Sequence, residues 1–237
     1  MLIEIWSDIM CPFCYIGKHH FESALRSVDF ANEIEVQYKS YQLNPEYHFI
    51  PGETVFSMLR KSKGMPEAQV HEMTAHVVEM AKHVGLTIDF QTNIPANTFL
   101  AHCLIHFAAT QGKGTAMKEH LFEAHFVEGK NIEDVDTLVD LAVSVGFDAS
   151  QAREALSDER YAYEVKQDLQ EARQIGIRGV PFFLFDRKYA VSGAQPTAAF
   201  VEVLEKSFGE WKSKNPSIQH LNEQDGGASC GPDGCSI

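Results

Sequence analysis

The sequence predicts an α/β fold in which a long all-helical segment interrupts a small sheet domain. Three observations support this prediction. A strand–helix–strand pattern occupies residues 2–43, residues 54–176 carry helical patterns and no convincing strand, and a hairpin followed by a helix comes after them. The expected order of elements is therefore β-α-β, a helical insertion, and then β-β-α.

The first strand and the first helix frame a pair of cysteines. Residues 2–8 form a largely apolar run that predicts a short buried strand. Cys11-Pro12-Phe13-Cys14 follows, and small and apolar residues then recur at the spacing of one helix face, at Gly17, Phe21, Ala24, Leu25 and Val28. Proline suits a first helical turn, because its fixed φ is helical and its missing N–H needs no partner there. Cys11 is therefore expected at the N-terminus of a helix.

This position suits a reactive thiol. Unpaired backbone N–H groups and the positive end of the helix dipole stabilise an anion there, and the thiolate is the nucleophilic form of cysteine. Cys14, one turn further along on the buried side, can attack a mixed disulfide formed by Cys11. A C-x-x-C pair can also be half of a zinc site. The preceding strand, the internal proline and the following helix favour redox chemistry.

The second strand and the insertion follow in order. Alternating polar and apolar residues predict a strand over residues 33–43, which stops at Asn44-Pro45, and a loop with Pro51 and Gly52 comes next. Helical stripes then predict helices at residues 70–84, 99–108 (with Asn97 as the N-cap), 117–124, 132–145, 150–156 and 160–174.

The last part of the chain completes the sheet domain. Residues 180–185 and 189–193 predict a hairpin with a turn at 186–188, and Thr197 is the expected cap of a final helix. From residue 213 the chain is polar and glycine-rich, which predicts a flexible tail. The predicted organisation is a sheet domain of residues 1–53 and 177–212, a helical insertion domain of residues 54–176, and a tail of residues 213–237. With C-x-x-C opening the first helix, this is the pattern of a thioredoxin-like fold.

Composition excludes several kinds of partner. The net charge of the 237 residues is −13, so no nucleic-acid-binding surface is expected. No stretch reaches the roughly 18 to 20 consecutive apolar residues of a membrane span, so no membrane partner is expected. Met1 leads directly into the first strand without the basic and apolar regions of a signal peptide. We therefore expect a cytoplasmic protein, in a compartment that disfavours structural disulfides.

The five cysteines fall into two close pairs and Cys103. Cys103 lies on the apolar stripe of its helix and is expected to be buried as a small hydrophobe. Cys230 and Cys235 enclose Pro-Asp-Gly, a turn that can bring two cysteines within the roughly 4.4–6.8 Å Cα separation of a disulfide. An accessory dithiol that exchanges electrons with Cys11 and Cys14 is the favoured interpretation. Soft-metal binding and a tail with incidental cysteines stay open.

Other titratable side chains carry weaker signals. Of the histidine pairs, only His102 and His106 have the i, i+4 spacing of a shared helix face, and no H-E-x-x-H motif accompanies them. The histidines are therefore expected in solvent or satisfied in the core rather than as metal ligands. Glu4 and Asp8 are candidates for a proton relay, although both are expected to be solvated.

Cys11-Pro12-Phe13-Cys14, the helical insertion and Gly179-Val180-Pro181-Phe182 together resemble the DsbA-like thioredoxin superfamily, and in particular its cytoplasmic FrnE-like branch. Residues 121–129, residues 173–183 and the C-terminal cysteine pair also fit that branch. The resemblance implies a protein thiol–disulfide oxidoreductase or disulfide isomerase. Cys11 is then the attacking thiolate and Cys14 the resolving thiol. Pro181 is then the cis-proline that faces the cysteines, and Val180 offers its backbone to an extended peptide.

The resemblance also implies the partners. Protein or peptide disulfides are the expected substrates, glutathione or a thioredoxin-type protein is the expected reductant, and no cofactor is required. The chain is expected to be a monomer or a homodimer. DsbA has a very low thiol pKa and an oxidising potential. Because a histidine between the cysteines adds positive charge and Phe13 does not, we expect Pro12-Phe13 to tune this protein toward reduction or isomerisation.

Two other functions stay open. Kappa-type glutathione transferases and hydroxychromene-carboxylate isomerases are similar in the insertion and the cis-proline region, and they act on glutathione. They carry serine at the position of Cys11, a pattern from which this chain departs. The second alternative is a metal-binding module in which the thiolates of both cysteine pairs hold zinc.

Overall fold

The computed structural model describes residues 1–216, 229–231 and 234–236 of the chain. Its four-stranded sheet has the order β2-β1-β3-β4, formed by β1 (Leu2–Ser7), β2 (Glu35–Ser40), β3 (Phe182–Phe185) and β4 (Tyr189–Ser192). β1 pairs in parallel with β2 and antiparallel with β3, and β3 and β4 form a hairpin. The mixed sheet and its helices confirm the predicted thioredoxin-like fold class.

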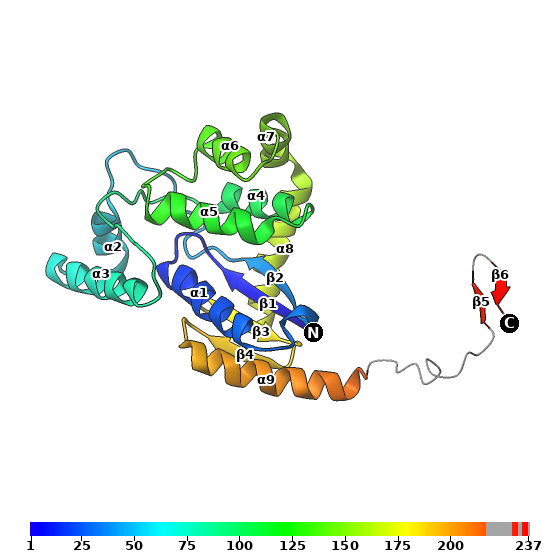
Figure 1. Ribbon diagram of the computed structural model, residues 1–237. Coiled ribbons are helices and arrows are strands. Elements are labelled where there is room, and N and C mark those ends of the chain that lie inside the picture. Colours follow the sequence, from blue (N-terminus) through cyan, green and yellow to red (C-terminus); the bar gives the residue numbers. More distant parts are fainter. Residues whose placement is uncertain (217–228, 232–233, 237) are drawn as a thin grey trace.

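Helices cover both faces of the sheet (Figure 1). Because side chains alternate along a strand, Ile3 and Ile5 of β1 pack on one face, in a core shared with α1 (Pro12–Ser27) and α9 (Thr197–Lys214). Trp6 points to the other face and packs against Ala172 of α8 (Glu159–Ile175). The sheet thus lies between two apolar layers, one of which it shares with α1.

The helical segment between β2 and β3 forms a second body of helices beside the sheet (Figure 1). Besides α8 it contains α2 (Val55–Lys63), α3 (Glu67–Lys82), α4 (Phe99–Ala109), α5 (Gly114–Phe126), α6 (Val135–Ser144) and α7 (Ala149–Ser157). All of residues 54–176 are described and none is in a strand, which confirms that the insertion is all-α. Its core is continuous with Cys11 and Cys14.

One helix of the insertion, α2, was not predicted. It begins with a capping box between Thr54 and Ser57, and Val55 is its only buried residue. A helix that buries so little shows no apolar stripe in its sequence. This is why sequence periodicity misses it.

Several predicted boundaries differ from the structure. β2 ends at Ser40 rather than at residue 43, because the chain turns there and the Leu43 N–H donates to Oδ2 of Asp8 at 2.7 Å. Thr197 does not cap α9, since Pro196 occupies the N-cap position and makes no side-chain capping bond. Asn97 is not the N-cap of α4 either, since Thr98 occupies that position, although the Oδ1 atom of Asn97 accepts from the Phe99 N–H at 2.9 Å.

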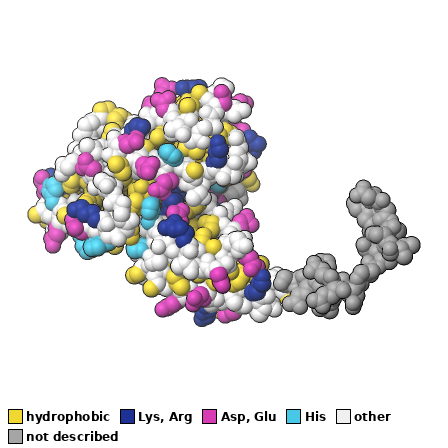
Figure 2. Space-filling model, viewed as in Figure 1, with side chains coloured by type: hydrophobic (Ala, Val, Ile, Leu, Met, Phe, Trp, Pro, Cys, Tyr) yellow, Lys and Arg dark blue, Asp and Glu magenta, His cyan; other side chains and the backbone are white. Residues whose placement is uncertain are grey.

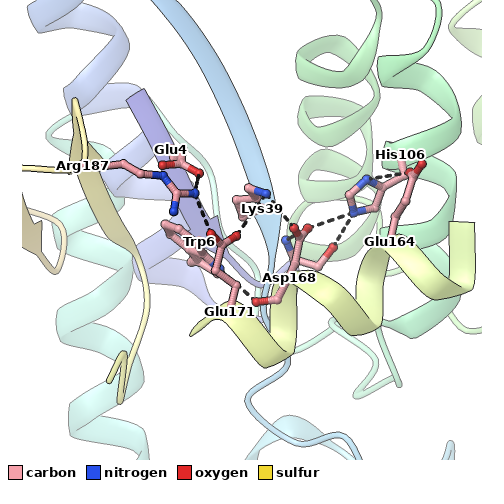
Figure 3. Close-up of polar contacts among 9 residues, drawn as sticks. Glu4, Trp6, Lys39, His106, Glu164, Asp168, Glu171 and Arg187 are labelled. Carbon is pink, nitrogen blue, oxygen red and sulfur yellow. Dashed lines mark hydrogen bonds and ion pairs between the residues drawn. The ribbon is translucent and has the colours of Figure 1, made fainter. Parts of the chain in front are cut away.

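Helix α8, which the sequence assigns to the insertion, is bonded to the sheet as well (Figure 3). Asp168 accepts the Ser40 N–H at 2.8 Å and lies 3.1 Å from Nζ of Lys39. The same carboxylate lies 3.0 Å from Nε2 of His106 on α4. Asp168 therefore joins β2 to the helical insertion.

The C-terminal segment is described in part. β5 (Ser229–Gly231) and β6 (Gly234–Ser236) form an antiparallel pair in which Cys230 stands opposite Cys235. The boundary placed at residue 213 falls inside the last turn of α9, which ends at Lys214. Residues 217–228, 232–233 and 237 of the predicted tail lie outside the described ranges.

The surface mixes both signs of charge. Figure 2 shows acidic and basic side chains interspersed over the visible face of the molecule. No helix in the described part of the chain is long and apolar enough to span a bilayer.

Candidate active site

The two cysteines occupy the start of α1, as the sequence predicts. Cys11 is the N-cap residue in an extended conformation, Pro12 is the first helical residue, and the Cys11 N–H donates to the Asp8 carbonyl at 3.2 Å. Both thiols are free and nearly buried, with 3% of Cys11 and 2% of Cys14 exposed. Phe13 between them is 39% exposed. The Cys11 sulfur therefore lies at a helix N-terminus, beside an exposed phenylalanine at the edge of the core.

The segment before β3 reaches this sulfur from the far end of the chain. The Cys11 thiol donates to the Val180 carbonyl at 3.6 Å, although the two residues are 169 positions apart. The peptide bond between Val180 and Pro181 is cis. The structure thus brings Cys11, Cys14, Val180 and Pro181 together at one place.

Asp8, whose carbonyl accepts the Cys11 N–H, lies next to these residues. It is completely buried, and its Oδ1 atom lies 3.4 Å from Nε2 of His102, which also contacts the Tyr41 carbonyl at 2.9 Å. Burial opposes ionisation of Asp8, but His102 and the Leu43 N–H outweigh burial, so the pKa of Asp8 lies below its usual value. The expectation that Asp8 is solvated is wrong, because the loop after β2 and helix α4 cover it.

Glu4 is a second correction. The sequence predicts a solvated carboxylate, whereas only 1% of Glu4 is exposed. Its Oε1 atom accepts from the Arg187 guanidinium at 2.5 Å (Figure 3). Glu4 points to the face of β1 that α8 covers, and the turn between β3 and β4 supplies the arginine that neutralises it.

Cys14 is buried slightly more completely than Cys11. Burial and the hydrogen bond with Cys11 raise the pKa of Cys14 well above its usual value. Helix α5 contributes two buried groups: Lys118, which sequence reasoning missed, and His125, one of the histidines expected in solvent or in the core. Their spacing with Phe122 (i, i+4, i+7) places them on one helix face, and this pattern was the available signal. Burial lowers the pKa of His125 to about 4, so its ring is neutral near pH 7.

The remaining candidates separate into different environments. Cys103 is buried, as predicted, and burial raises its pKa to about 12. His102 and His106 share a helix face but bind different partners, Asp8 and Asp168. Within residues 1–216 and the two short strands, no group of three or more His, Cys, Asp or Glu side chains could hold a metal ion. For Cys230 and Cys235 the structure describes only the backbone pairing.

Comparisons with known proteins found similar chains. A solved structure of the probable DsbA oxidoreductase SCO1869 from Streptomyces coelicolor is 36% identical, has a TM-score of 0.83, and covers 100% of this chain and 99% of its own. YwbO of Bacillus subtilis, described as uncharacterized, is 30% identical over 214 residues, which are 90% of this chain and 98% of YwbO.

A more distant neighbour shows the fold alone. The cytosolic disulfide reductase DsbM from Pseudomonas aeruginosa, solved with GSH, has a TM-score of 0.60 at 18% identity and covers 92% of this chain and 100% of its own.

The model of the DSBA-like thioredoxin domain matches residues 2–205. This chain belongs to the family of DSBA-like thioredoxin domains.

Proposed function

We propose that this protein is a thiol–disulfide oxidoreductase that acts on disulfides of proteins or peptides. The observation that carries the proposal is the position of Cys11, whose sulfur lies at the N-terminus of α1 against the Val180 carbonyl, with Cys14 one turn along. A helix N-terminus stabilises a thiolate. The resolving cysteine stays protonated because it is buried.

The reaction needs only these two sulfurs. The Cys11 thiolate attacks one sulfur of a substrate disulfide, forms a mixed disulfide and releases the other substrate sulfur as a thiolate. Cys14 then attacks Cys11 and releases the second substrate thiol. The substrate gains two electrons and the Cys11–Cys14 pair is oxidised to a disulfide. A substrate thiol that attacks the mixed disulfide in place of Cys14 completes an isomerisation.

The surroundings of Cys11 favour an extended, partly apolar substrate. Phe13 is 39% and Leu43 48% exposed, and the Leu43 backbone is bonded to Asp8, three residues before Cys11. Exposed apolar side chains beside a reactive group favour apolar partners. We infer that an unfolded segment lies along Val180 and contacts these two side chains.

The C-terminal cysteines are proposed as an accessory dithiol. Cys230 and Cys235 are partners in an antiparallel pair. Residues opposite each other in such a pair have Cα atoms about 4.5–5.5 Å apart, within the range of a disulfide. We propose that this pair exchanges electrons with Cys11 and Cys14, and that glutathione or a thioredoxin-type protein in the cytoplasm reduces the chain.

The decisive experiment is recovery of activity from scrambled, oxidised ribonuclease, together with insulin reduction. We expect the native protein to be active, Cys11→Ser to be inactive, and Cys14→Ser to accumulate mixed disulfides with its substrate. A chain truncated before Ser229 measures the contribution of the C-terminal pair. Activity that survives Cys11→Ser would contradict the proposal. Glutathione conjugation by Cys11→Ser would instead favour the glutathione-dependent isomerase or transferase.

A further inference from the structure

A small cleft opens between the loop after β2 and the end of α8. Its volume is about 80 Å³, and it is lined by Tyr41, Gln42, Pro45, Leu169, Arg173 and Ile177. Leu169 and Arg173 are one helical turn apart, so they lie on the same side of α8. A cavity of about 150 Å³ holds a benzene molecule. This cleft therefore has room for one short side chain.

Both walls of the cleft lead to the reactive sulfur. Leu43, in the loop that forms one wall, donates its N–H to Oδ2 of Asp8 at 2.7 Å, and the Asp8 carbonyl accepts the Cys11 N–H. Ile177, in the other wall, lies three residues before Val180, whose carbonyl accepts from the Cys11 thiol. A substrate whose disulfide reacts at Cys11 can therefore place a neighbouring side chain in the cleft.

The loop that forms the first wall is held by hydrogen bonds to α4 and to the segment before it. Nε2 of His102 contacts the Tyr41 carbonyl at 2.9 Å. The side chain of Asn97 accepts from Nε2 of Gln42 at 3.1 Å and donates to the Pro45 carbonyl at 3.0 Å. The cleft is thus already formed, and a group that enters it need not order the loop, which would weaken binding.

The guanidinium in the cleft has no carboxylate partner among the residues that the structure describes. Arg173 is exposed, and the two carboxylates nearest to it along α8, Asp168 and Glu171, are paired with Lys39 on β2 (Figure 3). Other arginines of the chain do form ion pairs, namely Arg60, Arg153, Arg160 and Arg187. Arg173 therefore remains available to an anionic group from outside the protein.

The end of α8 does not need this side chain as a cap. An arginine in the last turn of a helix can bond the terminal carbonyls. Here backbone groups do so, because the Gly176 N–H donates to the Arg173 carbonyl at 3.2 Å and the Ile177 N–H donates to the Ala172 carbonyl at 2.9 Å. The helix end therefore gives no reason for an arginine at this position, whereas a ligand in the cleft does.

We propose that the cleft binds an aspartate or glutamate side chain of the substrate, whose carboxylate pairs with the Arg173 guanidinium while the substrate disulfide lies at Cys11. This rests on the proposed function. The planar guanidinium suits both oxygens of a carboxylate. Leu169 and Ile177 offer apolar surface to the methylene groups of the same side chain. Arg173 is then a specificity-determining residue, and preferred substrates carry an acidic residue on one side of the reacting cysteine.

Such a preference opposes the overall charge of the protein. The net charge of −13 repels acidic peptides and attracts basic ones. Long-range electrostatics alone therefore predicts a faster reaction with basic substrates. A faster reaction with acidic substrates, confined to one side of the cysteine, requires a local cation.

The test uses short peptides with one cysteine in a mixed disulfide with thionitrobenzoate, whose coloured release reports the reaction with Cys11. Glu, Gln or Lys is placed at each of three positions on either side of the cysteine. With the reduced native protein, we expect Glu on one side to react about fivefold faster than Gln, the effect of one partly exposed ion pair. Arg173→Gln should abolish this difference, and Arg173→Glu should make Lys the preferred residue.

Arg26 provides the matched control. It is an exposed arginine in the last turn of α1, as Arg173 is in the last turn of α8. It lies 15 positions after Cys11, about 22 Å along the helix. Arg26→Glu therefore makes the same change of charge far from the cleft, and we expect it to leave the preference for Glu unchanged. Both variants should keep the native melting temperature, because both side chains are exposed.

A second readout does not depend on disulfide exchange. Peptides with serine in place of the cysteine are added to the 15N-labelled native protein. The Nε–Hε signal of Arg173, identified by its loss in Arg173→Gln, is then followed by NMR. We expect the peptide with Glu at the preferred position to shift this signal and the matching Gln peptide to leave it in place.

The outcomes separate this proposal from the proposed function. If no peptide releases thionitrobenzoate, or if release survives Cys11→Ser, the proposed function fails, and the Arg173 signal still reports whether the cleft binds a carboxylate. Equal rates with Glu and Gln at every position, or loss of the preference in Arg26→Glu, overturn the role of Arg173. A lower melting temperature of Arg173→Gln with equal slowing of all peptides shows a structural role and also overturns it.

Discussion

Gly17 and Pro181 are so close that a Cβ atom on Gly17 would lie 3.0 Å from Cγ of Pro181. The same atom would lie 3.4 Å from Cα of Ala194, so backbone also limits the space. The absent side chain lets the segment before β3 approach α1 and brings the Val180 carbonyl to Cys11. Gly17, one helical turn after Cys14, therefore sets the geometry of the site.

Enlarging Gly17 should impair activity more than stability. We expect Gly17→Leu to displace residues 180–181 and reduce insulin reduction at least tenfold, because small displacements at a reacting centre have large kinetic effects. Gly209 of α9 is the matched control, since a Cβ atom added there would meet nothing within 4 Å. Gly209→Leu should keep full activity, and Gly209→Ala should stabilise the protein by about 1 kcal/mol. Full activity of Gly17→Leu would contradict this account.

The turn between β3 and β4 should be less stable without Arg187. Asp186 and Arg187 have φ values of 48° and 51°, a strained conformation for side chains other than glycine. Arg187→Gly relieves that strain but leaves the buried Glu4 without its cation (Figure 3). An unpaired buried carboxylate is the larger effect, so we expect a net loss of about 2 kcal/mol in urea unfolding.

Two variants check the cause of that loss. Asp186→Gly relieves similar strain and keeps the ion pair, so it should leave stability equal or higher. Adding Glu4→Gln to Arg187→Gly should recover part of the loss, since the unpaired charge is removed. A stability loss in Arg187→Gly that Glu4→Gln does not reduce would point to another contact of Arg187.

Acid should loosen the contact between α1 and α5 through Glu119. Burial opposes ionisation of this carboxylate, but its bonds with His19 and Lys18 outweigh burial and lower its pKa from 4.5 to about 2. The folded-state pKa is depressed, so the stabilisation is complete above pH 4.5 and is lost as the pH falls toward 2. We expect Glu119→Gln to cost on the order of 2 kcal/mol at pH 7 and nothing at pH 2, by urea unfolding at each pH. An equal cost at both pH values would exclude the ionic explanation.

A histidine at position 13 should make the protein more oxidising. Phe13 lies in the first turn of α1 and is exposed, so an imidazolium there would stabilise the Cys11 thiolate and with it the reduced state. We expect Phe13→His to raise the reduction potential by about 30 mV at pH 6, with a smaller rise at pH 8. Phe49, which is 38% exposed, provides the control Phe49→His, with no expected change. An unchanged potential in Phe13→His would falsify this account of tuning.

Local patterns predicted the elements that carry the chemistry. The strand before Cys11, the proline after it and the apolar stripe from Cys14 all lie within one short segment, and they indicated a thiol at a helix N-terminus. The helices of the insertion were equally predictable, because their apolar residues repeat at helical spacing over several turns. Helix α2, with one buried residue, was missed for the opposite reason.

The burial of polar groups could not be predicted from the sequence in the same way. Asp8 and Glu4 were expected in solvent, because an acidic residue beside a strand usually is. Their environment comes from α4, α8 and the turn after β3, elements far away in the chain. The burial of Lys118 could not be predicted for the same reason. Residue spacing shows which helix face carries Lys118, but not which element packs against that face.

The amino-acid sequence and the tertiary structure therefore determine different features of this protein. The amino-acid sequence specified where the reactive cysteines lie along a helix and which segments are helical, because backbone geometry and helix dipoles depend on neighbouring residues. Folding alone established which groups surround the sulfurs. The Val180 carbonyl reaches Cys11 from a distant element, and the burial that raises the pKa of Cys14 exists only once those elements pack.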